Sequence, residues 1–534
     1  VIGFITNSGW IDGNAQDGMR KCLEKEFSAI YIFNLRGAIR SRSGDMAKRE
    51  GQNVFDIMTG VAITILVKKP KAKGEKACIF YHDIGDYLSR NEKLTIIQNL
   101  THIGNPQMQW APVYPNEHGD WLNKRNEIFK LYIPLGNKED KKDKKTFFVP
   151  YYSNGLKTQR DPWCYNSSKP IVQVTAKSQI DFYNEQREKL TTQEIKDVDY
   201  STTKISWTHS VLSDIHRNKP YNTENCQIRE SIYRPFFKQY LLYYRPLNER
   251  MYQIPKLFPT PKHQNLVICV SGLGGTKESS VYISDYIVDL NCLDAGTQCF
   301  PLYWYDDSTA DIADLFSTSQ NDVDRYTRRD GITDWILSTA QKQYGSKVTK
   351  EDIFYYVYGI LHSPAYRKAF AVDLKKMLPR LPLVDNRDDF RAFSAAGRAL
   401  AELHLNYETI EPYKDAKVTL DPNGSINYRV EKMRFGKNGK EVDKSTIIYN
   451  NQITISKIPL KAYDYVLNGK SAIDWIMERY AVTTDNKSGI QNDPNDWAAE
   501  HNDEKYILNL LLRIITVSLE TCKIVASLPK LKLE

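Results

Sequence analysis

The sequence predicts an α/β sheet at the N-terminal end, followed by a much larger α+β region. In residues 1–90, apolar β-branched runs alternate with helical patterns, the order of an α/β sheet. From about residue 200, Tyr- and Val-rich strand-like runs come first and amphipathic helical patterns follow. The chain has 534 residues, enough for two large domains or about three of ordinary size. We therefore expect one domain over 1–100, a helical connection over 101–200 and a large domain over 201–534.

The first hundred residues contain four predicted strands and two predicted helices. VIGFIT at residues 1–6 has the composition of a strand, and Met19, Cys22 and Leu23 share one face of a helix. The segment between the second and third strands is basic and poorly apolar, so it predicts a loop. The expected strands lie at 1–6, 29–35, 61–67 and 77–84, and the expected helices at 12–26 and 86–100.

The remaining chain gives a coarser pattern. The charge run at 137–145 predicts a solvated loop, and a helix is expected over 178–190. Thr349 is a suitable N-cap for a long helical pattern, because Glu351 and Asp352 follow it in the first turn. We expect strand-like runs within 232–250, 266–274, 281–290, 299–305 and 447–456, and helices within 332–345, 349–378, 393–408 and 471–482.

Composition restricts the class of protein without naming a ligand. Hydrophobic residues at 41% and aromatic residues at 12% predict a globular protein, and a net charge of +8 is compatible with a polyanionic partner but does not demand one. None of the eight cysteines forms a CxxC pair and no histidines stand at ligand spacing, so we predict reduced thiols and no metal site. The apolar segment 505–528 is interrupted by Arg513, Glu520 and Lys523, which favours a packed helix over a membrane span.

Two glycine-rich stretches resemble nucleotide-binding loops but have the wrong spacing. VSGLGGTKES at 270–279 fits neither GxxxxGK[ST] nor GxGxxG, and a tight turn between strands is the better interpretation. In LNGKS at 467–471, Asp464 stands where the first glycine of a phosphate-binding loop would be. The chain taken alone therefore shows no complete catalytic constellation.

Longer phrases carry a resemblance to a known family. GFITNSGWIDGNAQDGMRKCLEKEF, IYIFNLRG and EGQNVFDIMTGVAITILVKK resemble the second half of a gamma-class DNA adenine-N6 methyltransferase core. CIFYHDIGDYLSRNEKL, YSNGLKTQRDPWCYN, YRPFFKQYLLYYRPLNER and EDIFYYVYGILHSPAYRKAF resemble the C-terminal portion of Type ISP restriction-modification enzymes. The resemblance implies the later half of a Rossmann-like methyltransferase sheet followed by a large α+β target recognition domain.

Enzymes of this family combine a nuclease, a helicase-like ATPase, a methyltransferase and a target recognition domain in one polypeptide. The resemblance therefore implies S-adenosylmethionine as a cofactor, with ATP and Mg²⁺ serving upstream segments. The glycine-rich S-adenosylmethionine loop and the Asn-Pro-Pro-aromatic loop are absent from this sequence, and GNPQMQ at 104–109 does not replace the latter. Because the chain also begins inside a predicted strand, we expect it to be the C-terminal part of a longer polypeptide that cannot methylate DNA alone.

Phe55 is the residue that the resemblance assigns to the target base. An enzyme that acts on the adenine amine must take the base out of the duplex, and the flipped base needs an apolar wall on its face. In the family an aromatic residue ahead of a late strand supplies one such wall, and Phe55 occupies that place. The alternative interpretation is that Phe55 belongs to the core and packs beneath its loop.

Basic and amide side chains give the predicted contacts to double-stranded DNA. Arg36, Arg40, Arg42, Lys48 and Arg49 lie close to Phe55 in sequence and could bind phosphates, although a solvated flexible loop would look the same. Arginine reads guanine and Asn or Gln reads adenine in the major groove, and FGKNGK at 435–440 has the pattern of a β-hairpin tip. The candidates placed in predicted loops are Lys157, Gln159, Arg160, Lys277, Arg328, Arg329, Arg434, Lys437, Asn438 and Lys440.

Three functions remain open at this point. The first is the C-terminal half of a cytoplasmic bacterial Type ISP enzyme, which recognises a duplex sequence and completes the adenine pocket. The whole polypeptide would methylate host DNA and cleave unmodified DNA. The second is a stand-alone DNA-binding specificity subunit with a degenerate methyltransferase remnant. The third is a carbohydrate- or protein-binding α/β module.

Overall fold

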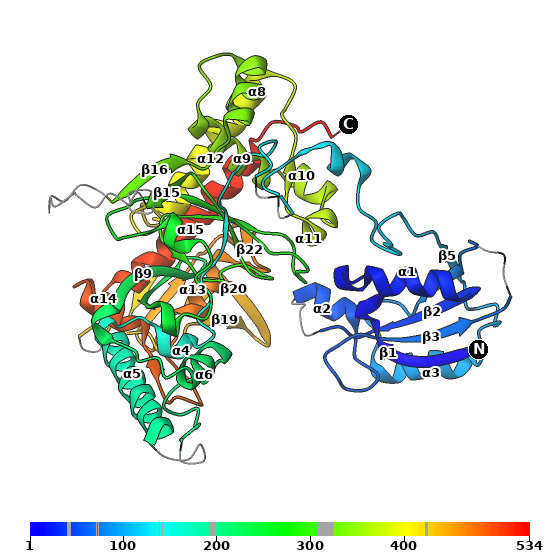
Figure 1. Ribbon diagram of the computed structural model, residues 1–534, viewed down its shortest axis with the longest axis horizontal. Coiled ribbons are helices and arrows are strands. Elements are labelled where there is room, and N and C mark those ends of the chain that lie inside the picture. Colours follow the sequence, from blue (N-terminus) through cyan, green and yellow to red (C-terminus); the bar gives the residue numbers. More distant parts are fainter. Residues whose placement is uncertain are drawn as a thin grey trace. The chain divides into compact units, whose positions relative to one another are not determined.

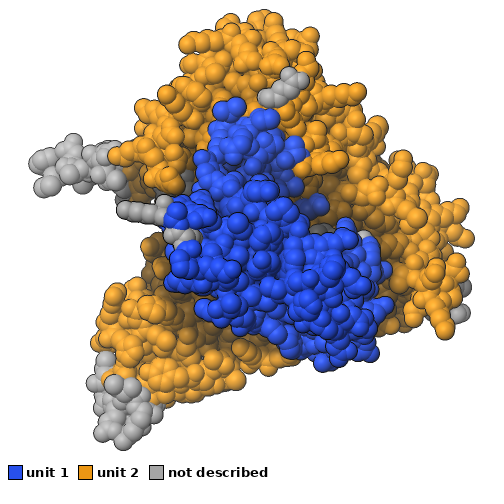
Figure 2. Space-filling view, turned by 90° about the vertical axis from the view of Figure 1, so that its right-hand side faces the viewer, with its two compact units in different colours: residues 1–131, 273–278, 369–378 blue, residues 132–272, 279–368, 379–534 orange. Residues whose placement is uncertain are grey.

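Contacts within the chain divide it into two units in the computed structural model (Figure 1). Unit 1 comprises residues 1–131 and two later segments, 273–278 and 369–378. Unit 2 comprises residues 132–272, 279–368 and 379–534, and Figure 2 colours the two units separately. The residues that the structure describes are 1–39, 44–70, 72, 74–137, 139–140, 142–192, 198–307, 325–421 and 425–533.

Unit 1 is built on a five-stranded sheet with the order β1-β3-β2-β4-β5. Strand β3 lies between β1 and β2 and is antiparallel to both, while β2 and β4 are parallel. The four strands expected from the sequence are all present, so the predicted α/β sheet is confirmed. The strands are β1 (Ile2–Asn7), β2 (Ala29–Arg36), β3 (Val61–Val67), β4 (Cys78–Asp83) and β5 (Ala111–Val113), and the helices include α1 (Asp17–Glu26), α2 (Gly44–Glu50) and α3 (Arg90–Leu100).

Helices α1 and α3 cover opposite faces of this sheet (Figure 1). Alternate residues of β2 serve the two faces: Ile30 and Ile32 belong to one apolar core, and Phe33 and Leu35 to the other. The expected loop between β2 and β3 differs from the prediction, because part of it forms the short helix α2. The run MAKRE consists of good helix formers, which explains the helix despite its low apolar content.

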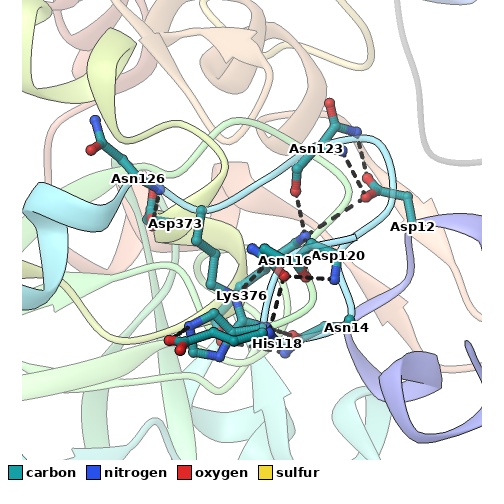
Figure 3. A network of polar contacts seen from close by, with 12 residues as sticks. Asp12, Asn14, Asn116, His118, Asp120, Asn123, Asn126, Asp373 and Lys376 are labelled. Carbon is teal, nitrogen blue, oxygen red and sulfur yellow. Dashed lines mark hydrogen bonds and ion pairs between the residues drawn. The ribbon is translucent and has the colours of Figure 1, made fainter. Parts of the chain in front are cut away.

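The segment 369–378 is fixed in unit 1 by a buried polar network (Figure 3). Lys376 Nζ donates to Asp120 Oδ1 at 2.9 Å and to the carbonyl of Asn123 at 2.7 Å. The side chain of Asp120 is 0% exposed and that of Lys376 is 5% exposed. The carboxylate of Asp373, in the short helix α11 (Asp373–Lys376), accepts from the backbone N–H of Asn126 at 3.0 Å. These contacts join residues about 250 positions apart in the sequence.

The described part of unit 2 contains three four-stranded sheets, with the orders β13-β9-β10-β8, β12-β11-β14-β7 and β18-β21-β20-β19. The long helix α5 (Lys169–Thr192) belongs to the same core, since Val172, Ile180 and Tyr183 are buried together with Leu241 of β10. In the structure, unit 2 begins at residue 132 and includes α5, whereas the sequence suggested a separate connection over 101–200.

The elements of unit 2 agree broadly with the sequence pattern. Thr349 forms the predicted N-cap with Asp352 in a capping box. None of the helices within the described ranges is long and apolar enough to cross a membrane. The α-helices in the described part of this unit are α4 (Asp161–Cys164), α5, α6 (His209–His216), α7 (Ile254–Leu257), α8 (Asp334–Tyr344), α9 (Lys350–His362), α10 (Pro364–Ala369), α12 (Arg387–Leu405), α13 (Ala472–Arg479), α14 (Pro494–Glu500) and α15 (Tyr506–Ala526), of which α10 reaches one residue into unit 1.

The strands of unit 2 are short, and several form two-stranded ribbons. They are β6 (Ile133–Pro134), β7 (Ser153–Asn154), β8 (Tyr165–Asn166), β9 (Gln227–Arg234), β10 (Phe237–Tyr243), β11 (Val267–Val270), β12 (Val281–Ser284), β13 (Ile287–Val288), β14 (Gln298–Pro301), β15 (Tyr303–Asp307), β16 (Tyr326–Asp330), β17 (Arg380–Leu381), β18 (Lys417–Leu420), β19 (Arg434–Asn438), β20 (Glu441–Ile448), β21 (Ile453–Ser456), β22 (Val466–Leu467), β23 (Lys470–Ser471), β24 (Thr483–Thr484) and β25 (Gln491–Asn492).

Candidate nucleic-acid interface

The loop that carries Phe55 is held by one buried amide side chain. Asn53 is 5% exposed, and its Nδ2 donates to the carbonyls of Thr59 at 2.7 Å and Gly37 at 3.3 Å. Its Oδ1 accepts from the backbone N–H of Phe55 at 2.9 Å, and the buried Val54 anchors the turn beside it. These contacts fix the backbone on both sides of Phe55, so the loop is a built turn ahead of strand β3.

The residue Phe55 is 53% exposed. The alternative that Phe55 packs in the core beneath its loop is therefore wrong, because Val54 fills that position instead. Ile57 and Met58 in the same turn are also exposed, at 45% and 55%. Sequence reasoning overlooked these two residues, although three large apolar side chains in a five-residue loop were the available signal. The role of Phe55 in stacking stays a prediction.

The arginines near Phe55 are bound to carboxylates. Arg36 Nε donates to Asp83 Oδ1 at 2.6 Å, and its Nη1 pairs with Asp86. Arg49 Nη2 also contacts Asp86, at 3.0 Å, and this bond together with that of Arg36 lowers the pKa of Asp86. A phosphate would have to compete with these carboxylates for Arg36 and Arg49. Lys48 is exposed on α2, while Arg40 and Arg42 lie outside the described residues.

Of the three candidate side chains in the segment 157–160, one is exposed to solvent. Gln159 is exposed and has φ +58°, and Lys157 is half-buried beside a backbone bridge to Arg250. Arg160 is only 2% exposed, and its Nη2 donates to Thr208 Oγ1 at 2.5 Å. Burial lowers the pKa of Arg160, and a guanidinium so placed does not reach a DNA base or phosphate. We therefore remove Arg160 from the proposed DNA contacts.

The β-hairpin predicted around FGKNGK is confirmed. Strands β19 and β20 pair as far as Asn438 and Glu441, which leaves a two-residue turn. Gly439 has φ +62° at the first turn position, the conformation that a type II′ hairpin requires and that glycine adopts without strain. Lys437, Asn438 and Lys440 are exposed at the tip, and Arg434 is exposed at the far end of β19.

The other basic candidates lie in different surroundings from those expected. Arg328 and Arg329 are exposed on strand β16, not in a loop, and the Arg328 guanidinium lies 4.3 Å from the ring centroid of Tyr303. Lys277 is half-buried and belongs to the segment 273–278 of unit 1, whereas the other candidates after residue 150 belong to unit 2. The glycine-rich stretch around it connects the antiparallel neighbours β11 and β12, which confirms the predicted turn between strands.

Polar groups in the described chain do not assemble a metal centre: no group of three or more His, Cys, Asp or Glu residues there could hold an ion. The candidate side chains that are exposed in the two units are apolar, basic or amide groups. Such side chains suit stacking on bases, phosphate contacts and base-edge hydrogen bonds.

Comparisons with known proteins agree with this picture. Residues 147–510 match the family model of the Type ISP C-terminal specificity domain. A solved structure of the ATP-dependent Type ISP restriction-modification enzyme LlaBIII bound to DNA is 38% identical, with a TM-score of 0.88 over 100% of this chain and 33% of that chain. No curated protein matches.

Two further solved structures are similar. A nuclease-deletion mutant of the Type ISP enzyme LlaGI in complex with a DNA substrate mimic is 36% identical, with a TM-score of 0.84 over 99% of this chain and 39% of that chain. The DrdV–DNA complex, solved by cryoEM, is 29% identical, with a TM-score of 0.82 over 99% of this chain and 50% of that chain. The chain thus spans between a third and a half of the chains it matches. It belongs to the Type ISP restriction-modification family, whose C-terminal specificity domain it contains.

Proposed function

We propose that this chain recognises a specific duplex DNA sequence and supplies one wall of the adenine pocket of a Type ISP enzyme. The whole enzyme would methylate adenine N6 in host DNA and cleave unmodified DNA. The observation that carries the proposal is the exposed ring of Phe55 on a turn fixed by the buried Asn53. The three similar structures support it, because each is described as a complex with DNA or a DNA mimic.

In unit 1, the flipped adenine would lie against the face of Phe55. A preformed apolar ring favours an extruded base because stacking contributes about 1–3 kcal/mol per base. S-adenosylmethionine would supply the methyl group. This sequence lacks both the glycine-rich loop and the Asn-Pro-Pro-aromatic loop, so residues outside it would hold S-adenosylmethionine and the adenine amine. The ATP and Mg²⁺ of the family would likewise be bound upstream, on the same polypeptide.

In unit 2, the β19–β20 hairpin is the best-placed element for reading sequence. The major groove of B-DNA admits a two-stranded ribbon, and Lys437, Asn438 and Lys440 are exposed at the ribbon tip. An asparagine amide can bind adenine through two hydrogen bonds, while lysine can bind guanine or a phosphate. Gln159, Arg328, Arg329 and Arg434 remain candidates for further contacts, because all four are exposed.

The first experiment identifies the target and then measures its recognition. Methylated adenines are sequenced in DNA from a host that carries the full-length gene, and this chain is titrated with duplexes that contain the identified site or a scrambled one. We expect preference for the site and affinity that falls steeply as salt rises. Asn438→Ala should reduce the preference by about 1 kcal/mol, since one bidentate contact is worth about 1–3 kcal/mol. Asn486→Ala, which removes an exposed amide from another turn, is the matched control.

Each remaining hypothesis predicts a different result. A stand-alone specificity subunit would bind duplex DNA with a salt-dependent affinity but leave the host adenines unmethylated, so that no methylated site would be found. A carbohydrate- or protein-binding module would show no salt-dependent DNA affinity, and either result would contradict the proposal.

A further inference from the structure

A groove of about 600 Å³ lies along helix α12 in unit 2, apart from the residues proposed to read the sequence. Side chains from three places line it: the exposed side of α12, the end of α8 with the turn at 345–348, and Asp352 in the first turn of α9. The buried rings of Tyr344 and Phe390 stack on each other at 4.3 Å and give the groove an apolar part. Its shape therefore rests on packed aromatic rings.

The charged side chains in this groove are mainly basic. Four cations line it against two carboxylates, those of Asp352 and Glu402. The Asp352 carboxylate already accepts from the N–H and the hydroxyl of Thr349, at 3.0 and 2.8 Å. The groove is consequently suited to an anion. The four cations are Lys347, Arg387, Arg391 and Arg398.

The three arginines differ in the contacts that their side chains make. Arg398 is held in place, 3.4 Å from Asp352 and with its guanidinium 4.1 Å from the ring centroid of Tyr355. Arg387 and Arg391 are exposed, and neither side chain makes an ion pair or hydrogen bond to another described residue. A bound anion could therefore recruit both without breaking an existing contact.

The spacing of these arginines suits a row of phosphates. Arg387 and Arg391 are one helical turn apart, which places their Cα atoms about 6 Å apart along the axis at ~1.5 Å per residue. Successive phosphates of one DNA strand are also about 7 Å apart in space, because they wind around the duplex axis while rising ~3.4 Å per step. On the same side of α12, the exposed residues Ala395 and Ala399 are small, so a DNA backbone can approach the helix closely beside Arg398.

We propose that this groove binds the phosphate backbone of duplex DNA through Arg387 and Arg391, with Arg398 at its far end. The inference rests on the proposed function that the chain binds DNA, and adds a contact that holds the duplex without reading its sequence. Arginine is well suited to this role, since its planar guanidinium can bind a phosphate through two parallel hydrogen bonds.

The test measures how the affinity of this chain for a fluorescent duplex depends on salt. Each lost phosphate contact lowers the slope of log K against log[salt] by about 0.9, so Arg387→Ala with Arg391→Ala should reduce it by about 2. The preference for the target site over a scrambled site should not change. Arg387→Lys with Arg391→Lys should keep most of the slope, because both charges remain. Lys177→Ala with Lys189→Ala on α5 removes two charges elsewhere, one on an exposed and one on a half-buried lysine, and should leave the slope within half a unit.

The outcomes separate this inference from the proposed function. A wild-type chain that binds no duplex would contradict the proposed function itself. Normal wild-type binding with equal slopes for the arginine pair and the α5 pair would overturn only the groove proposal. Polyglutamate serves as a second probe. If the arginine variant lost affinity for polyglutamate but kept the full DNA slope, the groove would bind an acidic protein segment, and the DNA proposal would be wrong.

Discussion

Two buried polar clusters, one in each unit, are held by different means. In unit 1, the charged pair of Lys376 and Asp120 is buried, and one buried amide, that of Asn53, fixes the turn that carries Phe55. In unit 2, the buried histidines His362 and His404 lie among aromatic rings and make neutral hydrogen bonds. The cluster of unit 1 should therefore be sensitive to the loss of a single polar side chain, and the histidine cluster of unit 2 to mild acid.

Lys376→Met should have the largest effect on stability. Removal of the lysine leaves Asp120 buried without its ion pair to Lys376, and breaking a buried pair in this way costs about 3–5 kcal/mol. Hydrogen exchange in peptides from residues 110–126 measures the loss within unit 1. Lys375→Met changes a half-buried neighbour and should cost less than about 1 kcal/mol. Asp120→Asn added to Lys376→Met should recover part of the loss, and no recovery would mean that the charge is not the cause.

Acid should weaken the buried histidine cluster of unit 2 at a higher pH than the Lys376–Asp120 cluster of unit 1. Burial lowers the pKa of His362 to about 4 and lowers that of His404 as well, while in the unfolded chain both titrate near 6.5. Between pH 6.5 and 4 the unfolded chain binds protons that the folded chain does not, so the free energy of unfolding decreases as the pH falls. For His362 the decrease is about 3 kcal/mol, from ~1.4 kcal/mol per pH unit.

In unit 1 the buried carboxyl group of Asp120 responds to acid only at a lower pH, because its folded-state pKa is lowered. Burial alone would raise the pKa of Asp120, but hydrogen bonds from Lys376 and Asn116 outweigh burial and lower it. Its contribution is complete above the ordinary pKa near 3.8 and is lost only as the pH falls through the lower folded value. Hydrogen exchange measured from pH 7 to 4 on peptides of each unit resolves the two. Burial raises the pKa of Asp289 in unit 2 to about 7, which opposes the histidine effect, so the measure is the difference in pH slope between wild type and His362→Phe. Equal slopes in the two proteins would contradict the assignment.

Local patterns were enough to predict strands β1 to β4 of unit 1, the N-cap at Thr349 and the hairpin around Gly439, although they missed β5. Each depends on residues within a few positions of one another, where periodicity and turn chemistry act. Lys376 and Asp120 are 256 positions apart, and no local pattern marks either residue as buried. The same limit explains Arg160, which looks like a loop residue and lies in the core, and the groove residues Arg387 and Arg391, whose neighbours across the groove come from another helix.

Asn53→Ala should have the next largest effect, confined to the Phe55 turn. The variant loses three hydrogen bonds and leaves backbone groups around residues 37 and 59 without this partner, at a cost of about 2–3 kcal/mol. Hydrogen exchange in peptides covering 51–60 reports this change directly. Asn53→Asp keeps the acceptor for the Phe55 N–H but places a buried carboxylate oxygen against the carbonyls of Thr59 and Gly37, so its loss should be at least as large as that of Ala. A clearly smaller loss from Asp than from Ala would show that the amide donors are not what holds the turn.

Phe55→Ala separates function from stability, because the side chain contributes to a pocket and little to the core. With 53% of the residue exposed, its removal should change the free energy of unfolding by less than about 0.5 kcal/mol. If the ring stacks on the flipped adenine, the full-length enzyme should lose about 2 kcal/mol of transition-state stabilisation, which is about 30-fold in methyl transfer. Met58→Ala is the matched control, since Met58 is equally exposed in the same turn, and Phe55→Trp should retain most activity. Asn53→Ala disturbs the whole turn, whereas Phe55→Ala removes only the ring. If Phe55→Ala and Met58→Ala both fold normally and lose the same amount of methylation, the apolar turn has a general contact role. Phe55 would then have no specific stacking role.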